Sequence, residues 1–224
     1  MDFTASTGII LASIIALGIL AVVCYQVYTS YRYTRKKYLL NFLGGFILLG
    51  LTYGIILVFG NNEANYPARL VLRGFAYVLI ALSYSYASKH ALVTKLLLGL
   101  VAVQAVVMSI YILPILDFLN PTIDAATAVA NMVVIFYIIN RTIVSPIRTK
   151  QTNYVTYAFI LFLLTEYTGL IHSIQVIDYV TYIALAIRTI ALAFCLLAVR
   201  TTQLDTQRVL ASQLVASRRE PSGA

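Results

Sequence analysis

Long runs of apolar residues alternate with short polar segments along the chain. Seven of these runs approach or exceed about 20 residues, which at about 1.5 Å per residue is enough to cross the hydrocarbon core of a bilayer. They cover residues 7–29, 40–60, 67–88, 95–116, 121–140, 153–174 and 177–200. The pattern predicts an all-α integral membrane protein, a seven-transmembrane-helix bundle at 1–200, followed by a cytoplasmic juxtamembrane helix and tail at 201–224.

The composition agrees with a membrane environment. Of the 224 residues, 61% are hydrophobic and only 11% are charged, with a mean hydropathy of +0.88. A soluble domain is closer to half apolar and a quarter charged, so a single water-soluble core could not bury these side chains. The lipid bilayer is therefore the expected partner of most of the surface.

Basic residues predict how the bundle is oriented. Thirteen of the sixteen Lys and Arg residues follow the first, third, fifth and seventh apolar runs. Basic loops stay in the cytoplasm, which predicts an external N-terminus and a cytoplasmic C-terminus in a multi-pass protein of the cell membrane. The opposite loops carry the acidic residues Asp2, Glu63, Asp117, Asp124 and Asp178. The net charge of +8 is thus an orientation signal, and nucleic acid is not needed to explain it.

Three charged residues lie deep inside the apolar runs. Glu166 lies in "FLLTEYTGLI", and Arg73 and Arg188 lie in two other runs. A lone charge at the bilayer centre costs about 2.5 to 3.5 kcal/mol on insertion scales. Helical rise places the three at similar depths, roughly 9 to 16 Å from the outer ends of their helices. We therefore expect Glu166 to face the bundle interior and to pair with Arg188, Arg73, or both.

This predicted polar centre has two interpretations. One is a structural salt bridge that fixes the helices in register. The other is a binding or proton-handling site, because ionisable groups inside membranes are often functional. Two arginines and one carboxylate leave one positive charge uncompensated. An anionic ligand, Asp124, Asp178 or water could stabilise that charge. The candidate residues of the centre are Glu166, Arg188, Arg73, Asp178, Asp124, Tyr167 and Tyr182.

Two segments resemble each other in sequence. "FILLGLTYG" at 46–54 matches "FILFLLTEY" at 159–167 at five of the first seven positions. Further along, "LRGFA" at 72–76 matches "IRTIA" at 187–191, which sets Arg73 opposite Arg188. The matches suggest a parallel 3+1+3 internal repeat, an order also found in SWEET sugar transporters. Chance similarity between Leu- and Ile-rich helices is the alternative, and the Pro-Gln signature of those transporters is absent.

Several kinds of chemistry find no support in the sequence. All five lysines lie in predicted cytoplasmic loops or at their edges, so a retinal Schiff base is excluded. The two histidines, His90 and His172, are predicted on opposite sides of the membrane, which argues against haem with two His ligands. No metal-ligand spacing and no catalytic motif is present. We therefore expect no cofactor, no metal site and no enzymatic activity.

Four small residues in the second run predict close helix packing: Gly44, Gly45, Gly50 and Gly54. Gly50 and Gly54 have GxxxG spacing, which lets two helix backbones approach each other. Packing within the chain is the favoured use of this pair, and dimerisation is the alternative.

Three functions fit these features. The first is a sensor or receptor-like bundle with a polar centre in its outer half, which passes a change to a cytoplasmic partner. The second is a small-solute transporter built on the 3+1+3 repeat, and the third is a structural subunit of a larger membrane complex. The segment 201–224 begins as a helix with a narrow apolar stripe. It could contact a cytoplasmic or membrane protein, or lie on anionic lipid. A projecting helix has no obvious task in a transporter and favours the sensor.

Overall fold

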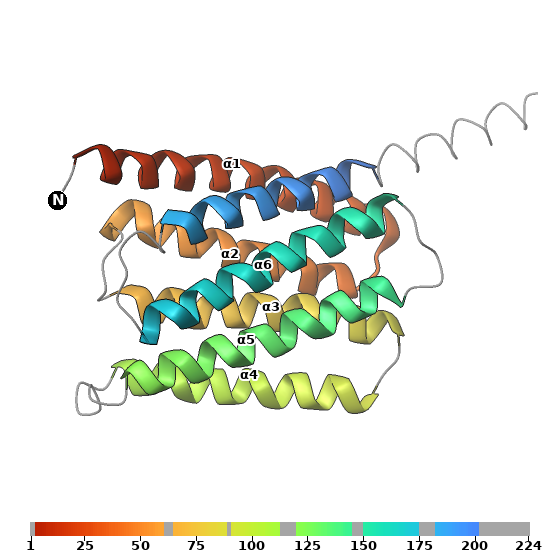
Figure 1. Cartoon of the computed structure of the whole chain (residues 1–224). Helices are drawn as coiled ribbons and strands as arrows, with labels where there is room; N and C mark the ends of the chain where they lie inside the picture. The colour runs from red at the N-terminus through yellow and green to blue at the C-terminus, as the bar shows by residue number, and fades with distance from the viewer. Residues whose placement is uncertain are drawn as a thin grey trace, which may run out of the picture.

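The computed structural model describes residues 3–60, 65–88, 91–112, 120–144, 150–174 and 182–201, and every regular element in these ranges is an α-helix. An additional helix, Tyr182–Thr201, is drawn in blue in Figure 1 and is called the C-terminal helix below. The labelled helices are α1 (Phe3–Thr34), α2 (Tyr38–Phe59), α3 (Tyr66–Ser88), α4 (Ala91–Ile112), α5 (Asn120–Ile143) and α6 (Lys150–Ile174).

The lengths and apolar composition of these helices define a multi-pass membrane protein. Within the described ranges, six helices are long and apolar enough to cross a bilayer: α1, α2, α3, α5, α6 and the C-terminal helix. The described apolar part of α4 is shorter, Ala91–Leu100. The all-helical architecture is thus confirmed, whereas the count of seven spans, their orientation and the repeat stay predictions.

Among the labelled helices, α1 and α4 have described ends that differ from the predicted bounds by four or five residues. α1 continues five residues past the predicted end at 29 and has 32 residues, about 48 Å at the rise of an α-helix. This exceeds the hydrocarbon thickness of about 30 Å, so α1 is tilted or its last turns leave the apolar layer. α4 begins at Ala91 rather than at residue 95. Lys95 therefore lies inside a helix, where a long side chain can extend towards water.

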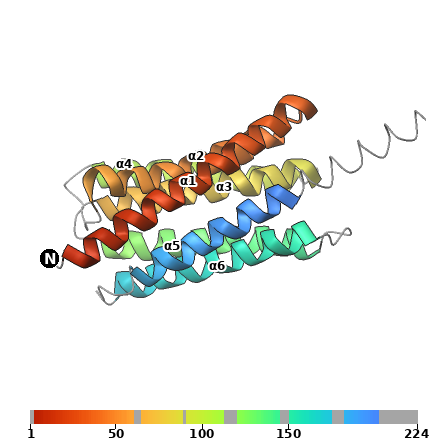
Figure 2. The same cartoon turned by 90° about the horizontal axis from the view of Figure 1, so that it is seen from above.

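α3 is the central helix of the bundle. It packs against α2, α4 and α5, and 72% of its most apolar window is buried, compared with 28–39% in the other five candidate spans. Figures 1 and 2 show the helices running lengthwise in one elongated bundle, with the C-terminal helix lying between α1 and α6. Because α3 has protein on most sides, most of its polar residues are buried against other helices: Arg69, Arg73, Tyr77, Ser83 and Ser85.

Backbone features at the helix ends follow from the local sequence. α2 ends at Gly60, whose φ of 77° lies in the left-handed region that glycine adopts without steric cost. Pro67 and Pro121 are in the first turns of α3 and α5, where a missing N–H leaves no helical hydrogen bond unmade. These residues explain why the helices begin and end where they do.

Close helix packing occurs at Gly45, one of the four glycines expected to allow it. A Cβ added to Gly45 would lie 2.6 Å from Ile80 Cγ1 and 2.9 Å from the Ala76 carbonyl oxygen, so α2 and α3 touch here. A Cβ on Gly54 would meet no described atom within 4 Å, and one on Gly50 would have ordinary contact with Leu17 at 3.8 Å. Gly45 therefore meets the expectation of packing within the chain, whereas Gly54 makes no such contact with the described residues.

Candidate functional site

Glu166 is the centre of a buried polar cluster. Its position on α6 faces the inside of the bundle, and the residue has 0% exposure. Its carboxylate oxygen Oε1 accepts a hydrogen bond from Arg73 Nε of α3 at 2.8 Å, which is also a salt bridge. Arg73 itself is 3% exposed. This is a charge-assisted hydrogen bond of ordinary length between two ions that lipid and water do not reach.

Two uncharged donors complete the carboxylate's surroundings. The Tyr77 hydroxyl of α3 donates to Oε1 at 3.3 Å, and Asn131 Nδ2 of α5 donates to Oε2 at 3.3 Å. Asn131 Nδ2 also lies 3.4 Å from the Leu70 carbonyl oxygen of α3. Both carboxylate oxygens therefore accept hydrogen bonds. These bonds offset the free energy that is lost when a charged carboxylate is removed from water.

Arg188 of the C-terminal helix is the least tightly held member of the cluster. Its Nη2 lies 4.0 Å from Glu166 Oε1, which is an ion pair but too long for a hydrogen bond. Its buried Nε has no hydrogen-bond partner among the described residues, and neither has the buried Tyr53 hydroxyl of α2. The charge of Arg188 acts directly on that hydroxyl. Two buried polar groups on neighbouring helices thus face each other without a well-aligned bond.

Among the described residues, the ion pairs around Glu166 join two positive charges to one negative charge. Arg73 and Arg188 face one carboxylate, and Arg69, one turn before Arg73, is also buried, at 6% exposure. Arg69 Nε donates to the Asn65 carbonyl oxygen at 3.3 Å. Arg69 is therefore largely enclosed by protein, although it lies in the second turn of α3.

The predicted members of the centre fall into three groups. Glu166, Arg73 and Arg188 come together as expected. Tyr167 and Tyr182 do not, because they are 49% and 41% exposed on the outer surface of the bundle. The helical turn explains this correction, since Tyr167 follows Glu166 directly and so points about 100° away from it.

The structure describes only one of the two aspartates of the prediction. Asp124 on α5 is half-buried, and its charge acts on Tyr66 at the start of α3. Asp178 lies outside the described residues.

Asn131 is a member of the site that the sequence reasoning missed. It is completely buried in α5. A usable signal was present, because Asp124, Thr127 and Asn131 recur at intervals of three and four residues in an otherwise apolar helix. That spacing puts polar side chains on one helical face, which is the face that α5 turns towards α3.

Comparison with protein-family models, with curated proteins and with solved structures gives no match for this chain. The helices and the buried cluster therefore define its class directly. It is a helical, multi-pass membrane protein with a buried ionic centre that joins α3, α5, α6 and the C-terminal helix.

Proposed function

We propose that this protein is a receptor-like membrane sensor in which Arg188 and Tyr53 bind a small anionic ligand, and the C-terminal helix passes the change to a cytoplasmic partner. The observation that carries the proposal is the incomplete pairing of Arg188. Glu166 is well supplied by Arg73, Tyr77 and Asn131. Among the described residues, by contrast, neither Arg188 Nε nor the Tyr53 hydroxyl makes a well-aligned hydrogen bond, although the hydroxyl lies beside Arg188. A buried cation with unmade hydrogen bonds favours an anion that supplies acceptors.

The position of Arg188 supports a role in signalling. The C-terminal helix leads directly into the segment 202–224, so a rotation or shift of this helix would reach the tail. Arg188 is held at 4.0 Å by Glu166, a contact that an anion could replace at moderate cost. A ligand can move an equilibrium only by its difference in affinity between two states. Competition between ligand and Glu166 for Arg188 would provide that difference.

Transport of a small solute is the second candidate, and the two halves of the chain favour it. Residues 45–53 and 158–166 share the same order of buried, half-buried and exposed positions. In the matched segments Thr52 and Thr165 each donate a hydrogen bond of 2.7 Å to the carbonyl oxygen three residues before. These likenesses support a parallel repeat, and in repeat-built transporters the solute site lies between the copies.

Residues of the polar centre extend this correspondence between the two halves of the chain. Tyr53 matches Glu166, and Arg73 matches Arg188, in the two sequence segments. Glu166 bonds to Arg73, and Tyr53 lies beside Arg188, so each residue faces the arginine of the other half. This crossed pairing supports duplication followed by divergence of one position from tyrosine to glutamate or the reverse.

A spin-label distance measurement tests the sensor proposal. Labels at Tyr33 of α1 and Arg200 of the C-terminal helix would both occupy exposed positions. We expect the distance distribution between them to change in Arg188→Gln relative to the otherwise unmodified chain, because the helix loses its ionic contact with Glu166. A control pair at Tyr33 and Lys95 involves α1 and α4 only, and its distance should stay the same.

The outcomes separate the candidate functions. An unchanged Tyr33–Arg200 distance in a folded Arg188→Gln protein would contradict the sensor. Uptake of small anions by proteoliposomes containing the unmodified protein, lost in Arg188→Gln, would instead favour transport. Absence of both effects would leave the structural salt bridge as the role of the centre.

A further inference from the structure

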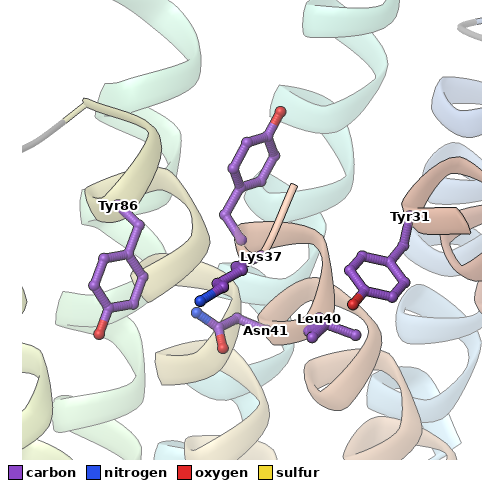
Figure 3. A pocket seen from close by; sticks show the side chains of 6 residues that line it. Tyr31, Lys37, Leu40, Asn41 and Tyr86 are labelled. Atoms are coloured by element: carbon purple, nitrogen blue, oxygen red, sulfur yellow. The ribbon is translucent and has the colours of Figure 1, made fainter. Parts of the chain in front are cut away.

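A basic groove lies on the surface of the bundle where α1, α2 and α3 meet. It has a volume of about 410 Å³ and is lined by Tyr31, Lys37, Tyr38, Leu40, Asn41 and Tyr86. Figure 3 shows the Lys37 amine beside the Asn41 amide, between Tyr86 of α3 and Tyr31 of α1. Polar and apolar groups thus share one surface hollow, which is separate from the buried Glu166 cluster.

Lys37 is the basic residue that lines the groove, and three more basic residues lie within five positions of it in the sequence. Arg32, Arg35, Lys36 and Lys37 are all exposed, and within the described ranges none of them takes part in an ion pair. α1, α2 and α3 contain no Asp or Glu residue. The positive charge at this end of the helices is therefore left for something outside these three helices to balance.

The turn between α1 and α2 holds Lys37 in place. Arg35 adopts a φ of 55°, and its backbone N–H donates to the Tyr31 carbonyl oxygen at 2.7 Å. The N–H groups of Leu39 and Leu40 donate to the carbonyl oxygens of Lys36 and Lys37, both at 3.0 Å. These bonds fix the tight turn, so Lys37 is presented at the start of α2, where the helix dipole also favours an anion.

An apolar stripe runs from the groove along α2. Leu40, Ile47 and Leu51 are 43–51% exposed, and their spacing of seven and four residues puts them on one helical face. In a membrane this face contacts acyl chains. The groove tyrosines are also of the type that occupies the boundary between headgroups and acyl chains.

We propose that this groove binds the headgroup of an acidic phospholipid, with the phosphate near Lys37 and Asn41 and the acyl chains along the α2 stripe. The positive charge without an internal partner selects an acidic headgroup over a zwitterionic one. The stripe selects a lipid over a free phosphate ion, because a free ion gains nothing from apolar surface. The inference does not depend on the proposed sensor function or on which leaflet this end of the bundle faces.

Native mass spectrometry of the full chain in detergent tests this site. Phosphatidylglycerol and phosphatidylcholine of equal acyl length are titrated separately, and we expect tighter binding of phosphatidylglycerol. Each Lys near an anionic headgroup changes the affinity about fivefold, so Lys37→Gln should lose about that factor for phosphatidylglycerol. Lys95→Gln is the matched control, because Lys95 is an exposed lysine of α4 outside the groove, and should lose little.

Other results would overturn the proposal. An equal loss in Lys37→Gln and Lys95→Gln would mean diffuse attraction to basic residues, and equal binding of the two lipids would mean no acidic-headgroup site. Displacement of phosphatidylglycerol by an equal concentration of inorganic phosphate would assign the groove to the free ion. If phosphatidylglycerol bound to the groove only after deletion of residues 202–224, the natural occupant of the groove would be the tail. Because Lys37 is exposed, thermal unfolding of both variants should match the unmodified protein.

Discussion

Arg73 Nε of α3 donates a hydrogen bond of 2.8 Å to Glu166 Oε1 of α6, across 93 positions of sequence. Arg188 Nη2 is 4.0 Å from the same oxygen. The two arginines therefore differ in how strongly they hold the carboxylate, although both lie in apolar runs and occupy matched positions in the two halves of the sequence. This difference leads to a quantitative prediction.

Glu166→Gln should destabilise the bundle by about 3 to 5 kcal/mol, because it leaves two buried arginines without a counter-charge. Double-mutant cycles measured by unfolding in a denaturing detergent would compare Glu166→Gln/Arg73→Gln with Glu166→Gln/Arg188→Gln. We expect the coupling energy of the first pair to be the larger, since only that pair forms a direct hydrogen bond. A larger coupling energy between Glu166 and Arg188 would show that Arg188, and not Arg73, is the main partner of Glu166.

Asn131→Ala should destabilise the bundle by about 1.5 to 3 kcal/mol, the usual range for a hydrogen bond to a charged group. The substitution removes the donor to Glu166 Oε2. Asn140→Ala is the control on the same helix, since Asn140 is exposed and should change stability by no more than about 0.5 kcal/mol. Unfolding curves of the two variants in one detergent provide the comparison, and equal losses would contradict the role given to Asn131.

Gly45→Ala and Gly54→Ala should have opposite effects, although both add one methyl group to α2. At Gly45 the methyl group meets the Ala76 carbonyl oxygen at 2.9 Å, and backbone cannot move aside easily, so we expect a loss of about 1 to 3 kcal/mol. At Gly54 nothing described lies within 4 Å, and alanine's greater helix propensity should leave stability unchanged or higher by up to about 1 kcal/mol. Thermal unfolding of both proteins measures the difference. A stabilising Gly45→Ala would mean that α2 and α3 are farther apart.

The predicted orientation can be tested by cysteine labelling. The background is Cys24→Ala/Cys195→Ala, because these are the two cysteines of the chain. In intact cells, a membrane-impermeant thiol reagent should modify Asn62→Cys from outside and should modify Thr149→Cys only after the membrane is opened, as the distribution of basic loops requires. The reverse pattern would invert the topology and place the Glu166 centre nearer the cytoplasmic side.

Deletion of residues 203–224 should leave a folded and inserted bundle, because none of these residues is needed to cross the bilayer. Expression level and thermal unfolding in detergent measure the effect. Loss of a bound cytoplasmic partner with unchanged stability would agree with the sensor. A large fall in the unfolding temperature would instead show that the tail packs against the helices.

The sequence by itself determined the class of protein and the residues that must avoid lipid. Runs of about 20 apolar residues can satisfy their backbone polar groups in a bilayer only as helices or closed barrels, and these runs have the helical length. The cost of a charge in hydrocarbon then required Glu166, Arg73 and Arg188 to face inward.

Only the tertiary structure decided which of these residues touch. Tyr167 and Tyr182 are in suitable apolar runs but point outward, since rotation about a helix axis depends on packing with neighbours. Tyr77 of α3 and Asn131 of α5 reach Glu166 because α3, α5 and α6 pack together. Gly45, unlike Gly54, lies where α2 and α3 are in tight contact. Apolar runs of similar composition can pack in many arrangements, and complementary side-chain shapes and hydrogen bonds between distant positions select one of them.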